Sequence, residues 1–419
     1  MPEGTVEGSE AGSAGWQRNL AAVWLSQLLA SLGFAFAFPF IPLFVQDLGV
    51  KDQHAVELWA GLLGFAGGIA MAVSAPVWGA LADRYGRKPM LLRAMLGGAV
   101  FLGAMGLVQN VEQLLVLRFL QGAVTGTMAA STALVASFVP RARLGFALGL
   151  IQVSAYAGFA LGPLVGGLIA DAFGYRYSFF LTSAVLAAGG IIVGFFVREG
   201  FAKPLASAHS GAPFADLGSL LRRPSFLLLI AAVFGIQGSE LMVMPIFPLF
   251  VQALTPEGHS VPSTVGLILG APAAVSAASA LAIGRISDRV GHRRMLAICT
   301  LGAGLAYLPQ SLSQDTAQVL LLQVAVGLFV GGMLPSANAL ISLAVPRGSQ
   351  GAAFGLSSTA ASLSSAVGPL AGAALATQLG LRSVFVAAGL LVGTTGMLAS
   401  LARRQAVQAV DAATLPTKR

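Results

Sequence analysis

The 419-residue sequence contains few charged residues: Asp, Glu, Lys and Arg make up only 10% of it, whereas about 25% is usual for a soluble domain. Hydrophobic residues make up 56%, and the mean hydropathy is +0.82. A chain with so little charge cannot keep the surface of a soluble globule hydrated. The composition therefore predicts an integral membrane protein.

Cysteine and histidine are also scarce, and the common catalytic motifs are absent. A single cysteine excludes a disulfide within the chain, and four scattered histidines argue against a metal site. No Gly-x-x-x-x-Gly-Lys-[Ser/Thr] loop is present to bind ATP phosphates, and no Ser/His/Asp or Cys/His arrangement is evident. We therefore expect no metal, no cofactor and no enzymatic activity.

Long apolar segments are abundant instead. Segments of about 20 to 28 uncharged residues can each cross a hydrocarbon core of roughly 30 Å as a helix, and the alternating segments of about 10 residues that a membrane barrel needs are missing. The sequence therefore predicts an all-α membrane protein with twelve transmembrane helices, at residues 19–45, 57–82, 90–109, 111–139, 145–172, 178–198, 225–252, 263–287, 294–313, 316–344, 351–378 and 382–403.

The basic residues test this count. With the N-terminus placed in the cytoplasm, 20 of the 24 Lys and Arg residues fall in cytoplasmic loops and tails. Lys51, Arg176 and Arg382 fall outside, and Arg118 lies within a span. This asymmetry follows the positive-inside rule, so we expect a multi-pass protein of the bacterial inner (plasma) membrane with both termini in the cytoplasm. It also explains the net charge of +8 without nucleic-acid binding.

Landmarks recur at an offset of 205 or 206 residues. Pro39-x-x-Pro42-Leu-Phe-Val-Gln46 recurs as Pro245-x-x-Pro248-Leu-Phe-Val-Gln252. The repeat predicts two six-helix bundles related by a pseudo-two-fold axis along the membrane normal, with a cavity between them near mid-bilayer. We expect a monomer divided into a cytoplasmic tail (1–17), an N-terminal bundle (18–198), a cytoplasmic linker (199–224), a C-terminal bundle (225–405) and a second cytoplasmic tail (406–419).

A cluster of charges lies between the second and third spans. The segment Gly79-Ala-Leu-Ala-Asp-Arg-Tyr-Gly-Arg-Lys-Pro-Met-Leu91 matches the pattern G-x-L-a-D-r-x-G-r-[rk]-x-x-L, and residues 284–296 repeat it more weakly. In this segment the chain resembles the major facilitator superfamily, and specifically its twelve-helix drug:proton antiporters. The resemblance covers about residues 18–405 and implies a transporter that alternates between outward-open and inward-open states.

The resemblance also implies that this loop acts as a latch that stabilises the outward-open state and yields when the cytoplasmic side opens. The alternative is that the charges serve only to fix the topology. The expected latch residues are Gly79, Asp83, Arg84, Gly86, Arg87, Lys88, Asp288 and Arg289.

The fifth span resembles the antiporter pattern G-x-x-x-G-P-x-x-G-G. A spacing of four places three of its glycines on one helix face, where they form a flat groove, and its proline removes a backbone hydrogen bond and bends the helix. Generic packing of small residues is the alternative. The motif residues are Gly158, Gly162, Pro163, Gly166 and Gly167.

Two ionisable residues within spans are candidates for proton coupling. An arginine in a span costs at least about 2.5 kcal/mol, and the resemblance of Leu-Arg118-Phe-Leu-Gln-Gly to the family's L-R-x-x-Q-G element implicates Arg118. An arginine that snorkels outward to pair with Glu112 is the alternative. Glu240 lies about 15 residues into its span, near mid-bilayer, where desolvation favours the protonated form of a carboxyl.

We expect Glu240 to be the leading proton carrier, because every other Asp or Glu falls in a tail, a loop or a span end. Many antiporters that resemble this chain place an acid in the first helix, where this sequence has only Gln27. The coupling site has therefore moved, or proton coupling is absent. A permanently protonated, structural Glu240 is a further alternative.

In the family the first, fourth, seventh and tenth helices line the cavity. Aromatic and methionine side chains with few polar groups suit lipophilic ligands of varied shape. The resemblance thus implies a substrate site formed by Gln27, Phe34, Phe38, Met128, Gln237, Met244, Met333 and Asn338.

These observations predict a secondary active transporter that exports a lipophilic small molecule in exchange for protons. Its expected partners are that substrate, protons and membrane lipid. Two alternatives stay open: an importer or uniporter of a small metabolite such as a sugar, and a membrane sensor or lipid-handling protein without transport.

Overall fold

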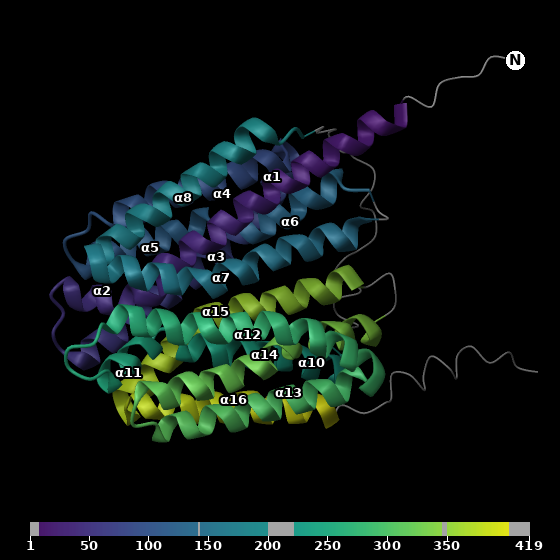
Figure 1. Cartoon of the computed structure of the whole chain (residues 1–419). Coiled ribbons are helices and arrows are strands. Elements are labelled where there is room, and N and C mark those ends of the chain that lie inside the picture. Colours follow the sequence, from purple (N-terminus) through teal and green to yellow (C-terminus); the bar gives the residue numbers. More distant parts are fainter. Residues whose placement is uncertain (1–7, 141–142, 200–221, 346–349, 402–419) are drawn as a thin grey trace, which may run out of the picture.

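The computed structural model describes residues 8–140, 143–199, 222–345 and 350–401, and these residues form helices and connecting turns without a strand (Figure 1). Residues 1–7 of the first predicted tail, the second predicted tail and most of the predicted linker lie outside the described residues, whereas residues 8–17 of the first predicted tail form the start of a helix. The helices of the N-terminal half are α1 (Gly8–Ala37), η1 (Phe38–Phe40), α2 (Ile41–Asp47), α3 (Gln53–Tyr85), α4 (Arg87–Met105), α5 (Val111–Val124), α6 (Thr127–Phe138), α7 (Leu144–Phe173) and α8 (Tyr175–Phe196).

The C-terminal half follows the same order. Its helices are α10 (Pro224–Val243), α11 (Phe247–Leu254), α12 (Val261–Val290), α13 (His292–Tyr307), η3 (Leu308–Leu312), α14 (Thr316–Ala344), α15 (Gln350–Leu379) and α16 (Leu381–Leu401).

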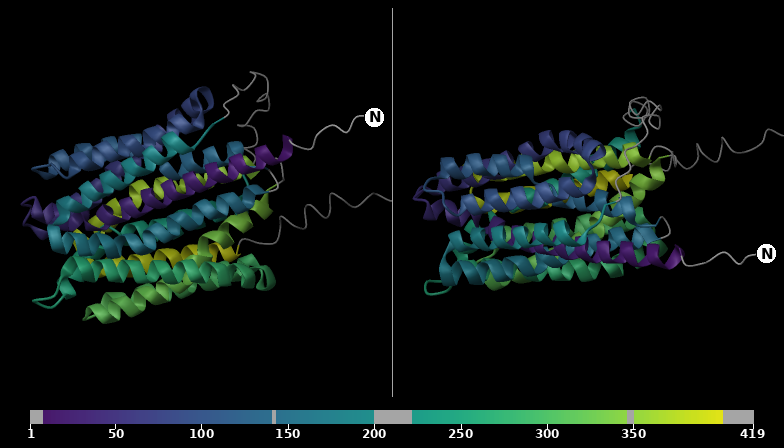
Figure 2. Two further views of the ribbon diagram at one scale, coloured as in Figure 1. Left: turned by 45° about the horizontal axis from the view of Figure 1, so that its top comes forward. Right: turned by 90° about the horizontal axis from the view of Figure 1, so that it is seen from above.

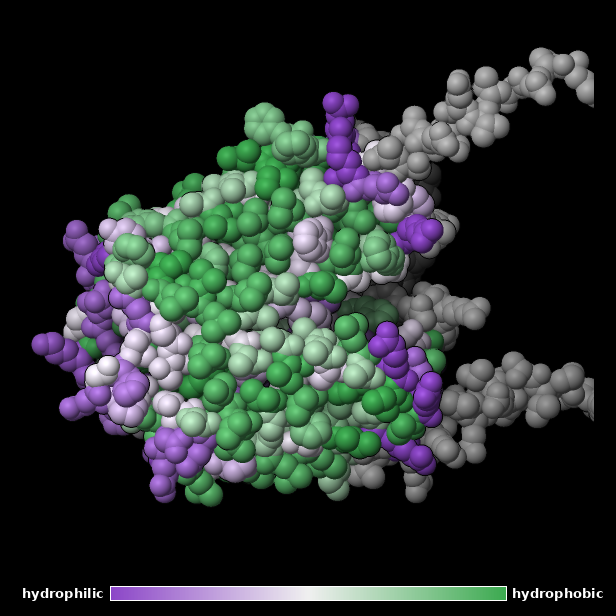
Figure 3. Space-filling view, viewed as in Figure 1, coloured by the Kyte–Doolittle hydropathy of each residue, from purple (hydrophilic) through white to green (hydrophobic). Residues whose placement is uncertain are grey.

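Twelve helical segments of the described chain are long and apolar enough to cross a membrane, which confirms the predicted number. Most of their limits agree with the predicted ones to within a few residues; the span predicted at 145–172, for example, is Leu144–Phe173. The seventh span, predicted at 225–252, ends earlier, at Val243. Figure 3 shows a broad apolar belt between two hydrophilic ends. The chain is therefore a multi-pass membrane protein.

Three of the spans are interrupted, which the sequence analysis did not predict. The first span passes through η1 at Pro39, and the seventh is broken between Val243 and Phe247, at Pro245. Proline lacks the N–H that would continue the helical hydrogen bonding. The fourth span breaks between α5 and α6 at Gly126, whose φ of 129° is accessible to glycine and strained for other residues.

The two halves lie side by side, with the N-terminal half above the C-terminal half in Figure 1, and their helices run roughly parallel in both views of Figure 2. They meet along two seams. In the first seam α7 packs against α12, and in the second α3 packs against α15.

Each seam is tight at one end. We call the end that carries the α3–α4 and α12–α13 turns, with their arginines, the basic end, and the other the far end. In the far-end half of the seams, an added Cβ on Gly61 or Gly68 would meet the backbone of α15, and one on Gly266 would meet the backbone of Pro163. The halves are therefore in direct backbone contact at the far end.

The same helix faces diverge toward the basic end. Gly79 lies about three turns beyond Gly68 on the α15-facing side of α3, and Gly149 about five turns before Gly167 on the α12-facing side of α7. No atom lies within 4 Å of a Cβ placed on Gly79 or Gly149. Gly284 and Gly355 on the partner helices are equally free.

The space-filling view is hollowed between the two halves on the side of this divergence (Figure 3). The conformation is therefore closed at the far end and open at the basic end.

Candidate functional site: a central cavity and its closure

Glu240 lies in the last turn of α10, and its side chain is exposed although it lies within a span. The opposite face of α10 is packed, since Gly235 contacts Thr395 and Gly238 lies against Leu391 of α16. Glu240 is close enough to interact electrostatically with Tyr156 of α7, and also with Tyr307 of α13 in its own half. Because Tyr156 belongs to the other half, the Glu240 carboxyl faces the space between the halves rather than lipid.

Arg118 of α5 lies between η1 and α3 within the N-terminal half. Its guanidinium carbon is 3.9 Å from the centre of the Phe38 ring, a distance that permits a cation–π interaction. An added Cβ on Gly67 of α3 would lie 3.0 Å from its Nε, which has no hydrogen-bond partner in the described chain.

A hydrogen-bonded chain connects Arg118 to the break in the fourth span. Its Nη1 donates to the Gln121 side-chain oxygen, and Gln121 Nε2 donates to Thr125 Oγ1 at 2.7 Å. The alternative pairing with Glu112 is not formed: Glu112 is exposed in the first turn of α5, and no ion pair joins these two described residues. Arg118 is thus held by aromatic and amide groups.

The expected substrate-binding residues divide into two groups. Phe34, Phe38, Met128 and Gln237 are partly exposed, while Met244 and Asn338 are exposed. The Phe34 and Phe38 rings lie 5.2 Å apart. Gln237 and Met244 share the Glu240 face of the seventh span at spacings of three and four. These residues combine apolar surface with a few polar groups.

Gln27 and Met333 do not line the cavity in this conformation, because each is only 2% exposed. Gln27 accepts a hydrogen bond from Ser131 Oγ at 2.9 Å and donates to Ser31 Oγ at 3.2 Å, so it joins α1 to α6. Met333 is packed within the C-terminal half. In apolar spans, sequence alone does not distinguish a cavity face from a packing face.

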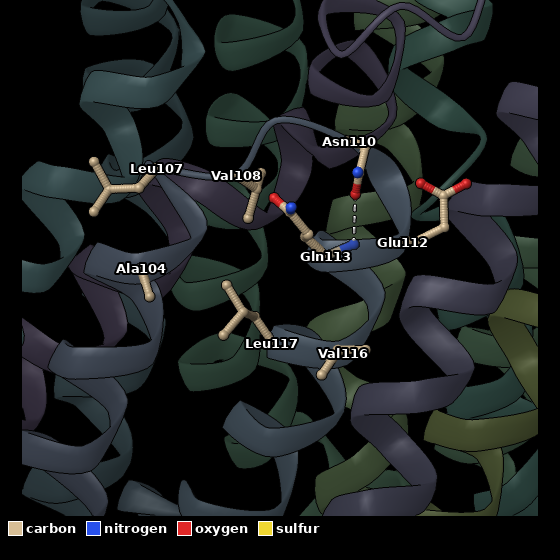
Figure 4. A pocket seen from close by; sticks show the side chains of 8 residues that line it. All are labelled: Ala104, Leu107, Val108, Asn110, Glu112, Gln113, Val116 and Leu117. Atoms are coloured by element: carbon tan, nitrogen blue, oxygen red, sulfur yellow. Dashed lines mark hydrogen bonds between the residues drawn. The ribbon is translucent and has the colours of Figure 1, made fainter.

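The described chain also has a shallow pocket of about 540 Å³ at the far end of the α4–α5 hairpin (Figure 4). Apolar side chains such as Leu107 and Val116 line most of it, and Glu112 lies beside the hairpin loop. None of the expected substrate-binding residues contributes to it, so it is separate from the central cavity.

The residues of the expected latch are bound within their own half. Gly86 has a φ of 100° and turns the chain from α3 into α4. Arg87 Nη1 donates to the Ala133 carbonyl at 2.8 Å, and Lys88 Nζ donates to two carbonyls near the end of α8. Arg84 is exposed above Tyr85, and the side chain of Asp83 lies outside the described residues.

The C-terminal copy of the latch is also free of the other half. Asp288 and Arg289 are exposed, and the nearest ion-pair partner of Asp288 is His292 at 4.0 Å. Gly79 also faces open space. The latch segments of both halves therefore lie at the open basic end, where the two halves are separated.

Glu199, which the sequence analysis did not single out, caps α4. Its two carboxylate oxygens accept the backbone N–H groups of Arg87 and Lys88, both at 2.8 Å. A carboxylate at this position satisfies free N–H groups and complements the helix dipole. No local pattern in the sequence indicates this cap, because Glu199 lies more than 100 residues from the helix that it caps.

Glu199→Gln is expected to lower stability by about 1 kcal/mol, because the amide presents only one acceptor oxygen and no charge. Thermal unfolding of the protein in detergent should show a lower melting temperature. Glu257→Gln, in an exposed turn, is the matched control and should leave the melting temperature unchanged. Equal melting temperatures for the two variants would contradict the capping role.

The antiporter motif of α7 faces two neighbours. An added Cβ on Gly158, Gly162 or Gly166 would collide with α1, on the residues Ser31 to Phe36. Gly167 instead contacts the backbone of Pro262 on α12. The motif therefore allows α7 to approach α1 closely within its half and α12 across the first seam.

Polar contacts reinforce the closure at the far end. Gln46 and Gln252, which are related by the repeat, exchange two hydrogen bonds of 3.1 and 3.0 Å. Asp171 at the end of α7 accepts the backbone N–H of Ser263 at 3.1 Å, together with the hydroxyls of Ser260 and Ser263. The first contact joins α2 to α11, and the second joins the end of α7 to the start of α12.

Replacing both Gln46 and Gln252 with Glu is expected to open the far end. Two carboxylates at this separation repel each other by about 1 to 4 kcal/mol, depending on the local dielectric. Spin labels at Gln109→Cys and Gln314→Cys, in exposed loops of the two halves, should move apart in electron–electron resonance measurements. The pair Gln46→Glu with Gln252→Lys should restore the short distance, and a short distance in the double-Glu variant would contradict the assignment.

Two helical bundles that are joined at one end and separated at the other define a membrane transporter of the alternating-access type. The Major Facilitator Superfamily model matches residues 23–260 and 240–414. The chain therefore belongs to the Major Facilitator Superfamily, a class of transporters rather than enzymes.

Named relatives are similar over almost the whole chain. The multidrug resistance protein MdtG of Salmonella typhimurium is 34% identical over 379 residues, which cover 90% of this chain and 93% of that protein. MdtG of Yersinia enterocolitica is 34% identical over 381 residues, covering 91% and 92% of the two chains.

Solved structures share the fold. A bacterial homologue of the human lysosomal transporter Spinster, in an inward-facing and occupied conformation, gives a TM-score of 0.75 at 16% identity and covers 91% of this chain and 96% of its own. The human organic anion transporter MFSD10 gives a TM-score of 0.65 at 19% identity and covers 92% and 99%.

Proposed function

We propose that the protein is a monomeric, proton-coupled exporter of lipophilic small molecules in the inner membrane of a bacterium, surrounded by membrane lipid. The excess of basic residues at one end supports placing that end, with both termini, in the cytoplasm. In this orientation the cavity is open to the cytoplasm. Such a conformation can accept a substrate from inside the cell.

The position of Glu240 is the observation that carries the proposal. Its carboxyl is exposed in a span and faces the cavity between the halves. In the conformation described here it can release a proton toward the cytoplasm, and in the opposite conformation it can take one up from outside. Partly exposed aromatic and methionine side chains nearby supply an apolar surface for the substrate.

Arg118 is the second in-span ionisable residue in this proposal. It is held by Phe38 and Gln121, and its Nε has no hydrogen-bond partner in the described chain. A half-buried cation that lacks a carboxylate partner favours negative charge nearby. Arg118 thereby helps a carboxyl or substrate group in the cavity to lose its proton.

In this proposal the latch makes its contacts in the opposite conformation, in which the basic end is closed. Closing the basic end would bring Gly79 of α3 against α15 and Gly284 of α12 against α7, so that the charged turns of Asp83 and Asp288 meet the other half. The open space beside both glycines in this conformation supports the proposal. The glycines of the α7 motif allow the two halves to move against each other between the conformation closed at the far end and the one closed at the basic end.

The test is transport by purified protein in liposomes with an imposed pH gradient. A fluorescent lipophilic cation should be moved against its own gradient while protons flow the other way, and an ionophore that collapses the pH gradient should stop the movement. Transport without dependence on the pH gradient would indicate a uniporter, and co-directional movement of protons and solute would indicate an importer. No movement of any candidate solute would support a sensor or lipid-handling role.

A further inference from the structure

A buried acid at the far end is not used by the proposed function. The Glu57 side chain is 2% exposed, and its Oε1 accepts a hydrogen bond of 3.3 Å from Gln53 Nε2. Its Oε2 has no hydrogen-bond donor in the described chain. The nearest basic group is His54 Nδ1, 3.8 Å from Oε2, on a side chain that is 66% exposed.

The helical register places Glu57 on the second seam. Glu57 precedes Gly61 by four residues and Gly64 by seven, so the three residues share one face of α3. That face packs against Pro369 and Ala373 of α15. Because α3 and α15 run antiparallel, Glu57 lies at the level of the last turn of α15, at the far end.

The repeat relates this position to the polar contact of the first seam. At an offset of 206 residues, Glu57 corresponds to Ser263 and Thr377 corresponds to Asp171. The first seam therefore pairs an acid on α7 with a serine on α12, whereas the second has the acid on α3 and the hydroxyl on α15. Thr377, however, donates its hydroxyl hydrogen to the Ala373 carbonyl. Glu57 thus lacks the donors that surround Asp171.

The helices packed on α3 place no lysine or arginine where it would neutralise the negative charge of an ionised Glu57. Helix α15 carries no ionisable residue, and α2 carries only Asp47. Lys51 and Asp52 precede α3 itself; both are exposed, and no ion pair joins these described residues to Glu57. Arg118 of α5 lies beside Gly67, about 15 Å farther along the helix. The basic residues of α4, Arg87, Lys88 and Arg93, lie at or near the basic end.

We propose that Glu57 is a second proton-binding site, loaded from the outer medium through His54, whose protonation accompanies closure of the far end. The neutral carboxylic acid fits the closed seam, since burying an unpaired carboxylate is costly. Separation of the halves hydrates the carboxyl and favours its ionised form. The inference rests on the proposed function for its orientation, because the far end must face the cell exterior.

Linkage between protonation and closure fixes the sign of the pH effect. The closed far end binds the proton more tightly than the open one, so acidic medium favours closure and alkaline medium favours opening. A single linked proton can change the ratio of the two conformations by up to about tenfold per pH unit.

The test measures the distance between spin labels at Gln109→Cys and Gln314→Cys from roughly pH 5 to 8. The population with a closed far end is expected to fall as the pH rises. Glu57→Gln should stay closed throughout, because its neutral amide mimics the protonated acid. Glu57→Asp should keep the pH dependence, and Asp52→Asn, an exposed neighbour, should behave as the parent.

An unchanged pH dependence in Glu57→Gln would overturn the inference, and so would a pH-independent parent. Melting temperatures of the Gln and Asp variants separate a folding defect from a loss of proton binding. This readout is independent of substrate transport. If the liposome assay shows no proton coupling while the Glu57-dependent opening persists, the proposed function fails and the inference stands.

Discussion

Glu240→Gln is expected to abolish uphill export while leaving downhill exchange of substrate intact. The amide has nearly the same shape as the carboxylic acid but cannot release a proton, so the conformational cycle is no longer linked to the pH gradient. In one-to-one exchange, a gradient of about one pH unit supplies roughly 1.4 kcal/mol and sustains about a tenfold solute gradient. In the variant the ratio of the substrate concentrations on the two sides of the membrane should fall to one.

The measurement compares accumulation with counterflow in the same liposomes. Glu112→Gln is the matched control, because Glu112 is an exposed acid at the far end of α5, and it should export as the parent does. Undiminished uphill export by Glu240→Gln would exclude Glu240 as the proton carrier. Loss of both accumulation and counterflow would point instead to substrate binding at this residue.

The sequence predicted the spans because charge is costly in lipid, and the same cost singled out Glu240 and Arg118. It could not predict which end of the molecule is closed. Gly68 and Gly79 lie on one face of α3, and Gly167 and Gly149 on one face of α7, so each seam has small residues along its whole length. Such a pattern permits closure at either end, and only the structure shows which end is closed.

Contacts between distant residues also escaped the sequence analysis. Asp171 and Ser263 are 92 residues apart, and neither belongs to a motif. Glu57 lies at the predicted start of a span, where an acid is common. Its burial depends on the packing of α15 against α3, which the sequence does not reveal. Gln46 and Gln252 were recognised as repeat landmarks, but repetition does not reveal that the two copies touch.

Gly68→Ala is expected to disable transport by preventing closure of the far end. The three atoms nearest to its Cβ would all be backbone atoms of α15, including the Ser365 carbonyl carbon at 2.7 Å and Ala366 N at 2.9 Å, and backbone cannot move aside as a flexible side chain can. Overpacking of this kind costs about 1 to 3 kcal/mol, which reduces the closed population about 5- to 150-fold.

The same substitution at Gly79 should act in the opposite direction. A Cβ there meets nothing in the conformation described here, but it would clash with α15 once the basic end closes. The Gln109–Gln314 label distance should therefore lengthen in Gly68→Ala and stay short in Gly79→Ala, with transport reduced in both. Gly194→Ala, whose Cβ makes an ordinary 3.8 Å contact with Leu92, should change neither distance nor transport. A short label distance in Gly68→Ala would show that α3 and α15 can separate without opening the far end, and would contradict a rocking motion about these seams.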